Sequence, residues 1–325
     1  MALPLWYFAD KRMPFLEAEQ FFRRAVTALQ SVSAEKENTI LCGLLLALQG
    51  WFASDTTSRA LVGKSLLILR QYYCPEETVV ALFIMGLIAG YGLRDFAEGE
   101  KVAREGAQIA RDLDIQWALG HCLLHIGYCL RGQGDLEQAR QVGQECLKIS
   151  EPIGNLWIMA ANALLVLGGV AMDRGDYLEA ERQIEQSLQW YSEVEFGYPW
   201  AGALCCEYLA KVALLTHQYD KAKFWLQQSL SYFQKAGRGI DREAGEALCY
   251  VSRLFAAWGS MENAVEILSA ISQIEHPPQD QYVGDLATAS LAELQAALPA
   301  EIYAAAVERG KLVDLNLVIT DFLAL

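Results

Sequence analysis

The sequence predicts an all-α solenoid in which helix hairpins stack on one another, and three observations support this prediction. A spacing of about 41 residues recurs along the 325-residue chain, and its clearest copies contain Gly134-Asp135 and Gly175-Asp176. Small residues recur at fixed places in each copy, and apolar runs lie between them. Because a repeated unit of this kind buries its apolar faces only by stacking on its neighbours, we expect one continuous array of helices.

Each copy is aligned on a small residue near the start of the second helix of a hairpin. Antiparallel helices approach closely only where side chains are small, since the ridges of one helix then enter the grooves of the other. We expect a second helix at each of these positions, the first of them spanning Phe15 to Leu29. The seven positions are Ala18, Ala60, Gly99, Ala139, Ala180, Ala222 and Ala264.

The turn inside each hairpin is predicted from a Gly followed by an Asp. Gly suits the left-handed position that ends a helix, and Asp caps the N-terminus of the next helix. Gly259-Ser260 has a weaker cap, and His217-Gln218 has neither residue. We interpret the recurring acidic residues as caps and first-turn charges, not as a catalytic carboxylate pair; they are Asp135, Glu137, Asp176 and Glu179.

The motif Ile126-Gly127-x-x-Leu130 followed by Gly134-Asp135-Leu136-x-x-Ala139 resembles the tetratricopeptide repeat. This resemblance implies a right-handed superhelical α-solenoid whose first helices line a concave groove. The usual period is about 34 residues. The longer spacing in this chain therefore predicts about one extra turn on each helix.

The long repeats and the tail together resemble the MalT-like sensor arm of signal-transduction ATPases with numerous domains, the STAND proteins. The resemblance implies repeats over residues 1–275, about six with the first incomplete, and a C-terminal helical cap over residues 276–325. It also implies a non-catalytic sensor arm that binds a ligand or partner and controls upstream ATPase and effector domains. The matching features are first helices opened by Trp117, Trp157 and Trp200, then His276-Pro277-Pro278, a helix from Leu286 to Ala297, Leu298-Pro299-Ala300-Glu301, Arg309-Gly310 and Asp314-Leu315.

The start of the chain contains little material for a first helix. Only Leu5-Trp6-Tyr7-Phe8 precedes the helix expected at Phe15. Natural solenoids begin with a capping element, because a terminal unit cannot bury its face alone. We therefore hypothesise that the chain is the C-terminal part of a longer protein, with a nucleotide-binding module upstream.

Composition indicates a cytoplasmic helical protein that binds neither nucleic acid nor membrane. A hydrophobic share of 53% supports an extensive core, and a net charge of −14 opposes binding to phosphates. The apolar runs are too short to span a bilayer, and Met1 to Phe8 lacks the pattern of a secretory signal. Eight cysteines without paired spacing predict reduced, buried thiols.

Few residues suggest catalysis, a metal or a cofactor, and we expect none of the three. His121 and His125 have the i, i+4 spacing of a chelating pair, but no third ligand is evident and the glutamate of the metalloprotease motif is missing. Gly63-Lys64-Ser65 lacks the upstream glycine of a phosphate-binding loop. A metal-dependent enzyme built on the two histidines remains an alternative.

The groove implied by the resemblance is expected to bind something amphipathic, such as a peptide, a protein segment or a small molecule. The carboxylate clamp of chaperone-binding tetratricopeptide domains is not expected, because Leu124, Leu165 and Glu207 occupy its positions. The alternative function is a constitutive protein-protein scaffold without ligand sensing. The candidate groove residues are Gln49, Phe52, Tyr91, His121, His125, Tyr128, Arg131, Asn162, Asp173, Glu207, Lys211, Glu246 and Arg253.

Overall fold

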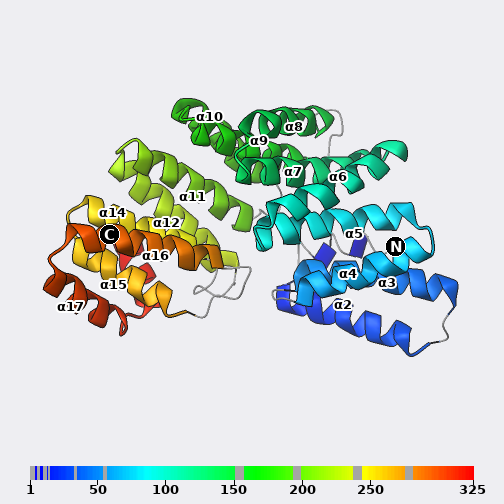
Figure 1. Cartoon of the computed structure of the whole chain (residues 1–325), viewed down its shortest axis with the longest axis horizontal. Coiled ribbons are helices and arrows are strands. Elements are labelled where there is room, and N and C mark those ends of the chain that lie inside the picture. The colour runs from blue at the N-terminus through cyan, green and yellow to red at the C-terminus, as the bar shows by residue number, and fades with distance from the viewer. Residues whose placement is uncertain are drawn as a thin grey trace. The chain divides into compact units, whose positions relative to one another are not determined.

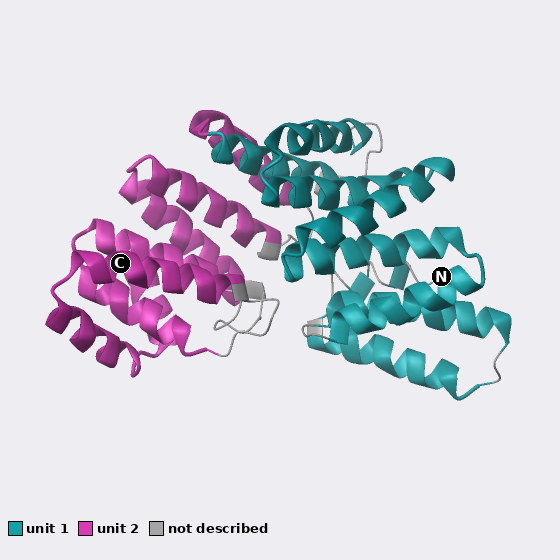
Figure 2. Cartoon of the chain, viewed as in Figure 1, with its two compact units in different colours: residues 1–174 teal, residues 175–325 magenta. Residues whose placement is uncertain are grey.

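The computed structural model is helical throughout the residues that it describes, with no strand among them. These residues are 4–5, 8–9, 13, 15–32, 35–53, 57–150, 157–192, 199–236, 244–274 and 281–325. The chain forms two compact units, residues 1–174 and residues 175–325 (Figure 2). The predicted all-α class and the hairpin architecture are confirmed.

Unit 1 is a row of antiparallel hairpins in which first helices contact first helices (Figure 1). The first helices α3, α5, α7 and α9 pack against one another in chain order, and α4, α6 and α8 are the second helices between them. The helices are α2 (Phe15–Gln30), α3 (Lys36–Phe52), α4 (Thr57–Gln71), α5 (Pro75–Leu87), a π-helical turn η1 (Ile88–Gly92), α6 (Phe96–Asp112), α7 (Gln116–Gly132), α8 (Leu136–Ser150) and α9 (Trp157–Asp173).

Unit 2 repeats the same arrangement and ends in three further helices. Here α11 contacts α14, and α14 contacts α16, so the first-helix row continues into the C-terminal segment. The helices are α10 (Tyr177–Ser192), α11 (Pro199–Leu215), α12 (Tyr219–Ala236), α14 (Gly245–Ala257), α15 (Met261–Ser272), α16 (Gln281–Ala297), α17 (Ala300–Gly310) and α18 (Leu315–Ala324).

The small residues of the second helices lie at helix contacts, with one exception. Ala18, Ala139 and Ala180 are fully buried, as the predicted register requires. Ala60 is exposed, however, and Ser58, two positions earlier, is buried in its place. The Oγ of Ser58 donates to the carbonyl oxygen of Gly50 at 2.5 Å, so a hydrogen bond to the preceding helix sets the register.

The hairpin turns show why Gly and Asp recur. Gly134, Gly175 and Gly259 have φ of +83°, +81° and +84°, in the left-handed region that favours glycine. His217 takes the same position with φ of +57°. Asp135 and Asp176 accept hydrogen bonds from the backbone amides three residues later, at 3.2 and 3.3 Å, which confirms the predicted caps. Ser260 makes no such side-chain bond.

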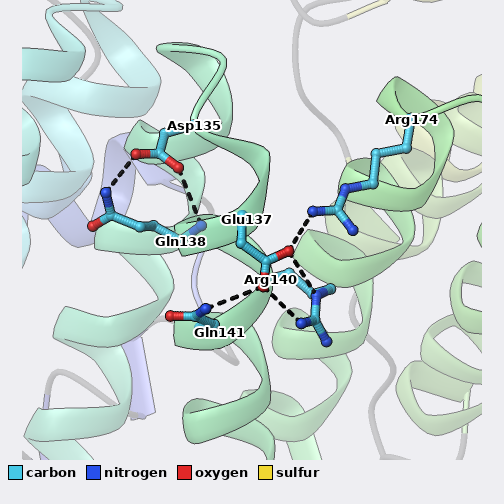
Figure 3. A network of polar contacts seen from close by, with 6 residues as sticks. All are labelled: Asp135, Glu137, Gln138, Arg140, Gln141 and Arg174. Carbon is cyan, nitrogen blue, oxygen red and sulfur yellow. Dashed lines mark hydrogen bonds and ion pairs between the residues drawn. The ribbon is translucent and has the colours of Figure 1, made fainter.

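Ion pairs link neighbouring hairpins on the exposed side of the second helices. In unit 1, Glu137 accepts from Arg140 on its own helix at 2.7 Å and from Arg174, after α9, at 2.6 Å (Figure 3). Gln141 also donates to it, at 3.1 Å. Hydrogen bonds from Arg140 first, and then from Arg174 and Gln141, lower the pKa of Glu137 to about 2. Such exposed pairs contribute little to stability, because water and salt screen their charges.

The C-terminal helices dock on the last repeat through the residues of the predicted tail motif. Arg309 at the end of α17 reaches Glu262 and Glu266 on α15, at 2.5 and 2.6 Å. A Cβ on Gly310 would lie 2.6 Å from the carbonyl oxygen of Glu266, so only glycine fits at this contact. Asp314 caps α18 by accepting from the amide of Asn316 at 2.9 Å. His276-Pro277-Pro278 lies outside the described residues.

The chain's eight cysteines are free, and all except Cys74 are buried. In the described part of the chain, no helix is long and apolar enough to cross a membrane.

Candidate functional site

Partly exposed side chains form a stripe along the first helices of unit 1. On α7 they are Trp117, His121, His125, Tyr128 and Arg131, spaced by three or four residues and therefore on one side of the helix. We call this stripe, together with Trp51 of α3, Tyr91 of η1, and Asn162 and Asp173 of α9, the unit 1 face. It contains seven of the candidate groove residues, and Trp51 is an additional residue that the sequence pattern did not include; the seven are Tyr91, His121, His125, Tyr128, Arg131, Asn162 and Asp173.

Aromatic rings pack across three first helices in the unit 1 face. The buried ring of Phe83 on α5 lies edge-on to Trp51, with 6.2 Å between the ring centroids, and edge-on to Trp117 at 6.1 Å. His121 stacks on Phe83 at 4.9 Å. Aromatic pairs of this geometry add about 0.5–1.5 kcal/mol each beyond their burial, so this part of the face is rigid.

Both histidines of the face are held in the neutral form. Burial lowers the pKa of His121 to about 4. Burial, and then the neighbouring His121, lower the pKa of His125 to about 3. The Nε2 atom of His125 is buried without a hydrogen-bond partner in the described part of the chain. Among the described residues, no group of three His, Cys, Asp or Glu side chains is placed to hold a metal.

Tyr128 and Arg131 continue the stripe toward the C-terminal end of α7. The Tyr128 ring lies 5.2 Å from that of Tyr91 and 6.1 Å from that of Phe96. Arg131 forms a bidentate ion pair with Asp173 of α9, with Nε to Oδ2 at 2.5 Å. Two candidate residues from adjacent repeats therefore bind each other.

Gln49 and Phe52 lie in the core of unit 1 instead of on an open surface. The Nε2 atom of Gln49 donates to Glu19 on α2 at 2.8 Å, and both side chains are buried. Phe52 is 1% exposed and stacks on Phe22 of α2 at 5.5 Å. The groove register misplaced these two residues because α2 covers this end of α3.

A second set of partly exposed side chains lies on the first-helix row of unit 2. We call it the unit 2 face: Leu204, Tyr208 and Lys211 on α11, Glu246 and Arg253 on α14, and Tyr282 on α16. Glu246 accepts hydrogen bonds from Tyr250 Oη at 3.0 Å and from Tyr282 Oη at 3.3 Å. The face therefore presents an acid held by two tyrosines, with two cationic side chains on the same helices.

Glu207 lies beneath this face and is only 3% exposed. Its Oε1 atom is buried without a hydrogen-bond partner in the part of the chain that the structure describes. Burial, followed by the nearby Glu246 carboxylate, raises the pKa of Glu207 well above its usual range, against a smaller opposing effect of Lys211. This environment therefore favours the protonated form of the Glu207 side chain.

The sequence pattern missed several residues that shape the two faces. Trp51 lies between the predicted groove residues Gln49 and Phe52, and a register shifted by one residue would have found it. Phe83 is fully buried, and the groove pattern does not include it. Tyr250 lies one helical turn after Glu246, so following that stripe by one turn would have found it. Tyr282 lies beyond the last repeat, where the 41-residue register no longer applies.

Comparisons with known proteins agree with this architecture. A family model described as tetratricopeptide repeat matches residues 159–235. No curated protein matches the chain.

Solved structures extend the likeness over nearly the whole length at low identity. A STAND protein with a tetratricopeptide repeat sensor from Pyrococcus horikoshii is 15% identical, with a TM-score of 0.59 over 97% of this chain and 48% of that protein. A Rap protein in complex with competence and sporulation factor is 14% identical, with a TM-score of 0.56 over 99% and 97% of the two chains. The apo form of RapI is 13% identical, with a TM-score of 0.56 over 90% and 85%.

This chain thus spans about half the length of the STAND protein and nearly all of the Rap protein. Identities this low show the fold alone. The chain has an all-α, tetratricopeptide-like solenoid fold.

Proposed function

We propose that this chain is the ligand- or partner-binding sensor arm of a multidomain, MalT-like STAND NTPase in the cytoplasm, and that it controls the upstream ATPase and effector domains. The observation that carries the proposal is the similarity of 97% of the chain to a STAND protein with a tetratricopeptide repeat sensor, of which it covers 48%. A sensor arm of this extent leaves room in such a protein for the domains that it controls.

Each unit is proposed to carry its own binding surface, which is the unit 1 face in one and the unit 2 face in the other. Both combine aromatic side chains with charged or polar ones, as Tyr128 and Arg131 do in unit 1 and as Tyr208 and Lys211 do in unit 2. Such surfaces suit an amphipathic peptide, a protein segment or a small molecule, because rings cover apolar groups while polar atoms fix orientation. Gln49 and Phe52 support the surface from beneath. The arm itself is proposed to be non-catalytic and to need no cofactor.

The second candidate is a constitutive scaffold that holds a protein without sensing a ligand. The observation that favours it is the similarity to Rap proteins, because this chain spans 97% of the Rap protein solved with competence and sporulation factor. In that Rap protein, the part similar to this solenoid makes up nearly the whole chain.

The experiment uses the natural gene product that contains this chain. Nucleotide hydrolysis is measured with and without cell extract fractions that activate it, for the wild type and for Tyr128→Ala and Tyr208→Ala. The matched control is Tyr73→Ala, since Tyr73 is 91% exposed in the turn after α4 and is outside both faces. A sensor arm loses activation in the two face variants and keeps it in the control.

The two candidates differ in their dependence on nucleotide and ligand. A scaffold retains its partner at the same affinity whether nucleotide is present or not, whereas a sensor arm changes hydrolysis when its ligand binds. Activation that persists in both face variants argues against sensing through these faces.

A further inference from the structure

A buried acid interrupts an otherwise apolar register of the first helices. The position three residues before the small contact residue of each first helix holds Leu124 in α7, Leu165 in α9 and Cys249 in α14, and all three are buried. In α11 the same position holds Glu207, which is 3% exposed. Burying a leucine at such a position stabilises the fold, whereas burying a carboxyl group there destabilises it because the group loses its hydration.

Interactions within the protein offset this cost only in part. Glu207 lies close enough to Glu246 on the adjacent helix to share a hydrogen bond, but its Oε1 atom has no partner among the described residues. A second acid is the least favourable neighbour, since two close carboxylates cannot both ionise without a cation between them. The arrangement is therefore incomplete as a purely structural element.

The groups around the pair are suited to a cation. Tyr250 and Tyr282 donate to Glu246 and hold its carboxylate in place, at 3.0 and 3.3 Å. Glu246 and Tyr282 are partly exposed, so the acid pair can be approached from the unit 2 face. The other titratable or charged groups nearby are Cys206 and Lys211 on α11, and Cys249 and Arg253 on α14.

We propose that Glu207 and Glu246 form a receptor site for a protonated primary amine carried by the ligand or partner of the unit 2 face. This inference rests on the proposed function, because it names the chemistry of one group of the occupant. An ammonium group has three N–H donors, which matches two carboxylates and a further oxygen. A metal ion is a poorer match, since no third acidic, cysteine or histidine ligand is placed here among the described residues.

Binding of an amine requires Glu207 to release a proton. Before binding, burial and the nearby Glu246 carboxylate favour the protonated form of Glu207. When the ammonium enters, the proton of Glu207 leaves to solvent and the ammonium takes its place. The site therefore gains a cation and loses a proton, and affinity rises with pH until the amine itself deprotonates.

The test uses two amine probes, each with a neutral counterpart. N-acetyl-lysine methylamide represents a peptide side chain and is compared with N-acetyl-norleucine methylamide. Cadaverine represents a free small amine and is compared with 1-pentanol. Binding is measured by titration calorimetry and ligand-observed NMR at pH 6 and pH 8, in two buffers of different ionisation enthalpy. The buffer difference gives the number of protons released.

We expect at least one amine to bind and its neutral counterpart not to bind, with proton release and with affinity higher at pH 8. Glu207→Gln and Glu246→Gln should weaken this binding at least tenfold. The control Glu293→Gln, at an exposed position of α16, should leave it unchanged. Glu207→Leu restores the residue of the equivalent positions in α7 and α9, so it should remain folded and also lose binding.

Equal binding of amine and neutral probe, unchanged affinity in Glu207→Gln, or absence of binding by both amines would overturn the proposal. If the lysine derivative binds, the ammonium group comes from a peptide side chain, and if cadaverine binds, it comes from a free small amine. If only the amine site is wrong, the full protein that carries Glu207→Gln is still activated by its ligand. If the proposed sensor function is wrong, the amine still binds, but nucleotide hydrolysis by the wild-type protein does not change when it binds.

Discussion

Arg131 and Asp173 join the last turns of α7 and α9 through two hydrogen bonds, with Nε to Oδ2 at 2.5 Å and Nη2 to Oδ1 at 3.3 Å. The arginine side chain is only 12% exposed, and its guanidinium group lies directly over Gly169. A Cβ at Gly169 would lie 2.4 Å from an arginine nitrogen, so glycine makes room for the pair. The ion pair therefore fixes the spacing of two adjacent repeats in unit 1.

We predict that this pair contributes about 1 kcal/mol of coupling free energy, because a bidentate pair with a largely buried guanidinium group is stronger than one in which both side chains are exposed. The measurement is a double-mutant cycle with Arg131→Ala and Asp173→Ala, followed by urea unfolding. The exposed pair of Arg70 and Glu105, joined at 2.6 Å, is the matched control and should couple by less. Equal coupling in the two cycles would contradict the prediction.

The hairpin register was predictable because close helix packing tolerates only small residues, and these recur with the repeat. Ala139 and Ala180 illustrate this, since both are fully buried. The error at Ala60 shows the limit of the pattern. Two small residues stand two positions apart in α4, and only the hydrogen bond from Ser58 to Gly50 distinguishes them.

The candidate faces were predictable only in part. The repeat shows which residues share one side of a first helix, but it does not show which side chains of other helices cover them. Gln49 is buried by Glu19, which lies 30 residues away on a helix that no groove register includes. Phe52 is covered by Phe22 of the same helix. The acid pair of Glu207 and Glu246 also depends on contact between two first helices, and residue spacing alone does not show that the carboxyl groups meet.

A second prediction concerns the contact of α17 with α15. Gly310→Ala should destabilise unit 2 by about 1–3 kcal/mol, because the new methyl group overlaps the carbonyl oxygen of Glu266 and the Cβ of Ser269, each 2.6 Å away. Hydrogen exchange should increase in residues 300–325. The control is Gly63→Ala within α4, where a Cβ meets nothing within 4 Å. That variant should gain about 0.5–1 kcal/mol from helix propensity, and a loss there would show that overlap is not the cause at Gly310.

A third prediction is that raising the pH weakens unit 2 through Glu207. Its pKa is raised in the folded protein, so its contribution is fully present below the unfolded value near 4.5 and is lost as pH rises through the folded value. Glu207→Gln keeps the shape without the proton. It should raise the urea midpoint relative to wild type at pH 8 by the equivalent of about 1 kcal/mol or more, and by less at pH 5. The control Glu293→Gln should show no such difference between the two pH values.

A fourth prediction is that lowering the pH weakens unit 1 through its histidines, in the opposite sense to Glu207. The pKa of His121 is lowered to about 4 and that of His125 to about 3, so between these values and the unfolded value of 6.5 the unfolded chain binds protons that the folded chain excludes. Stability should therefore fall as pH decreases below 6.5, by up to about 1.4 kcal/mol per pH unit for each histidine.

The variant His125→Leu tests this sign directly, because it removes the unpartnered Nε2 atom and one excluded proton. Its urea midpoint should change less than that of wild type between pH 7.5 and pH 5. His217→Leu is the control, since His217 lies in the turn after α11 in unit 2 and has its Nδ1 atom 3.0 Å from the hydroxyl of Tyr219. If His125→Leu and wild type lose the same stability on acidification, burial of the ring does not determine the acid sensitivity of unit 1.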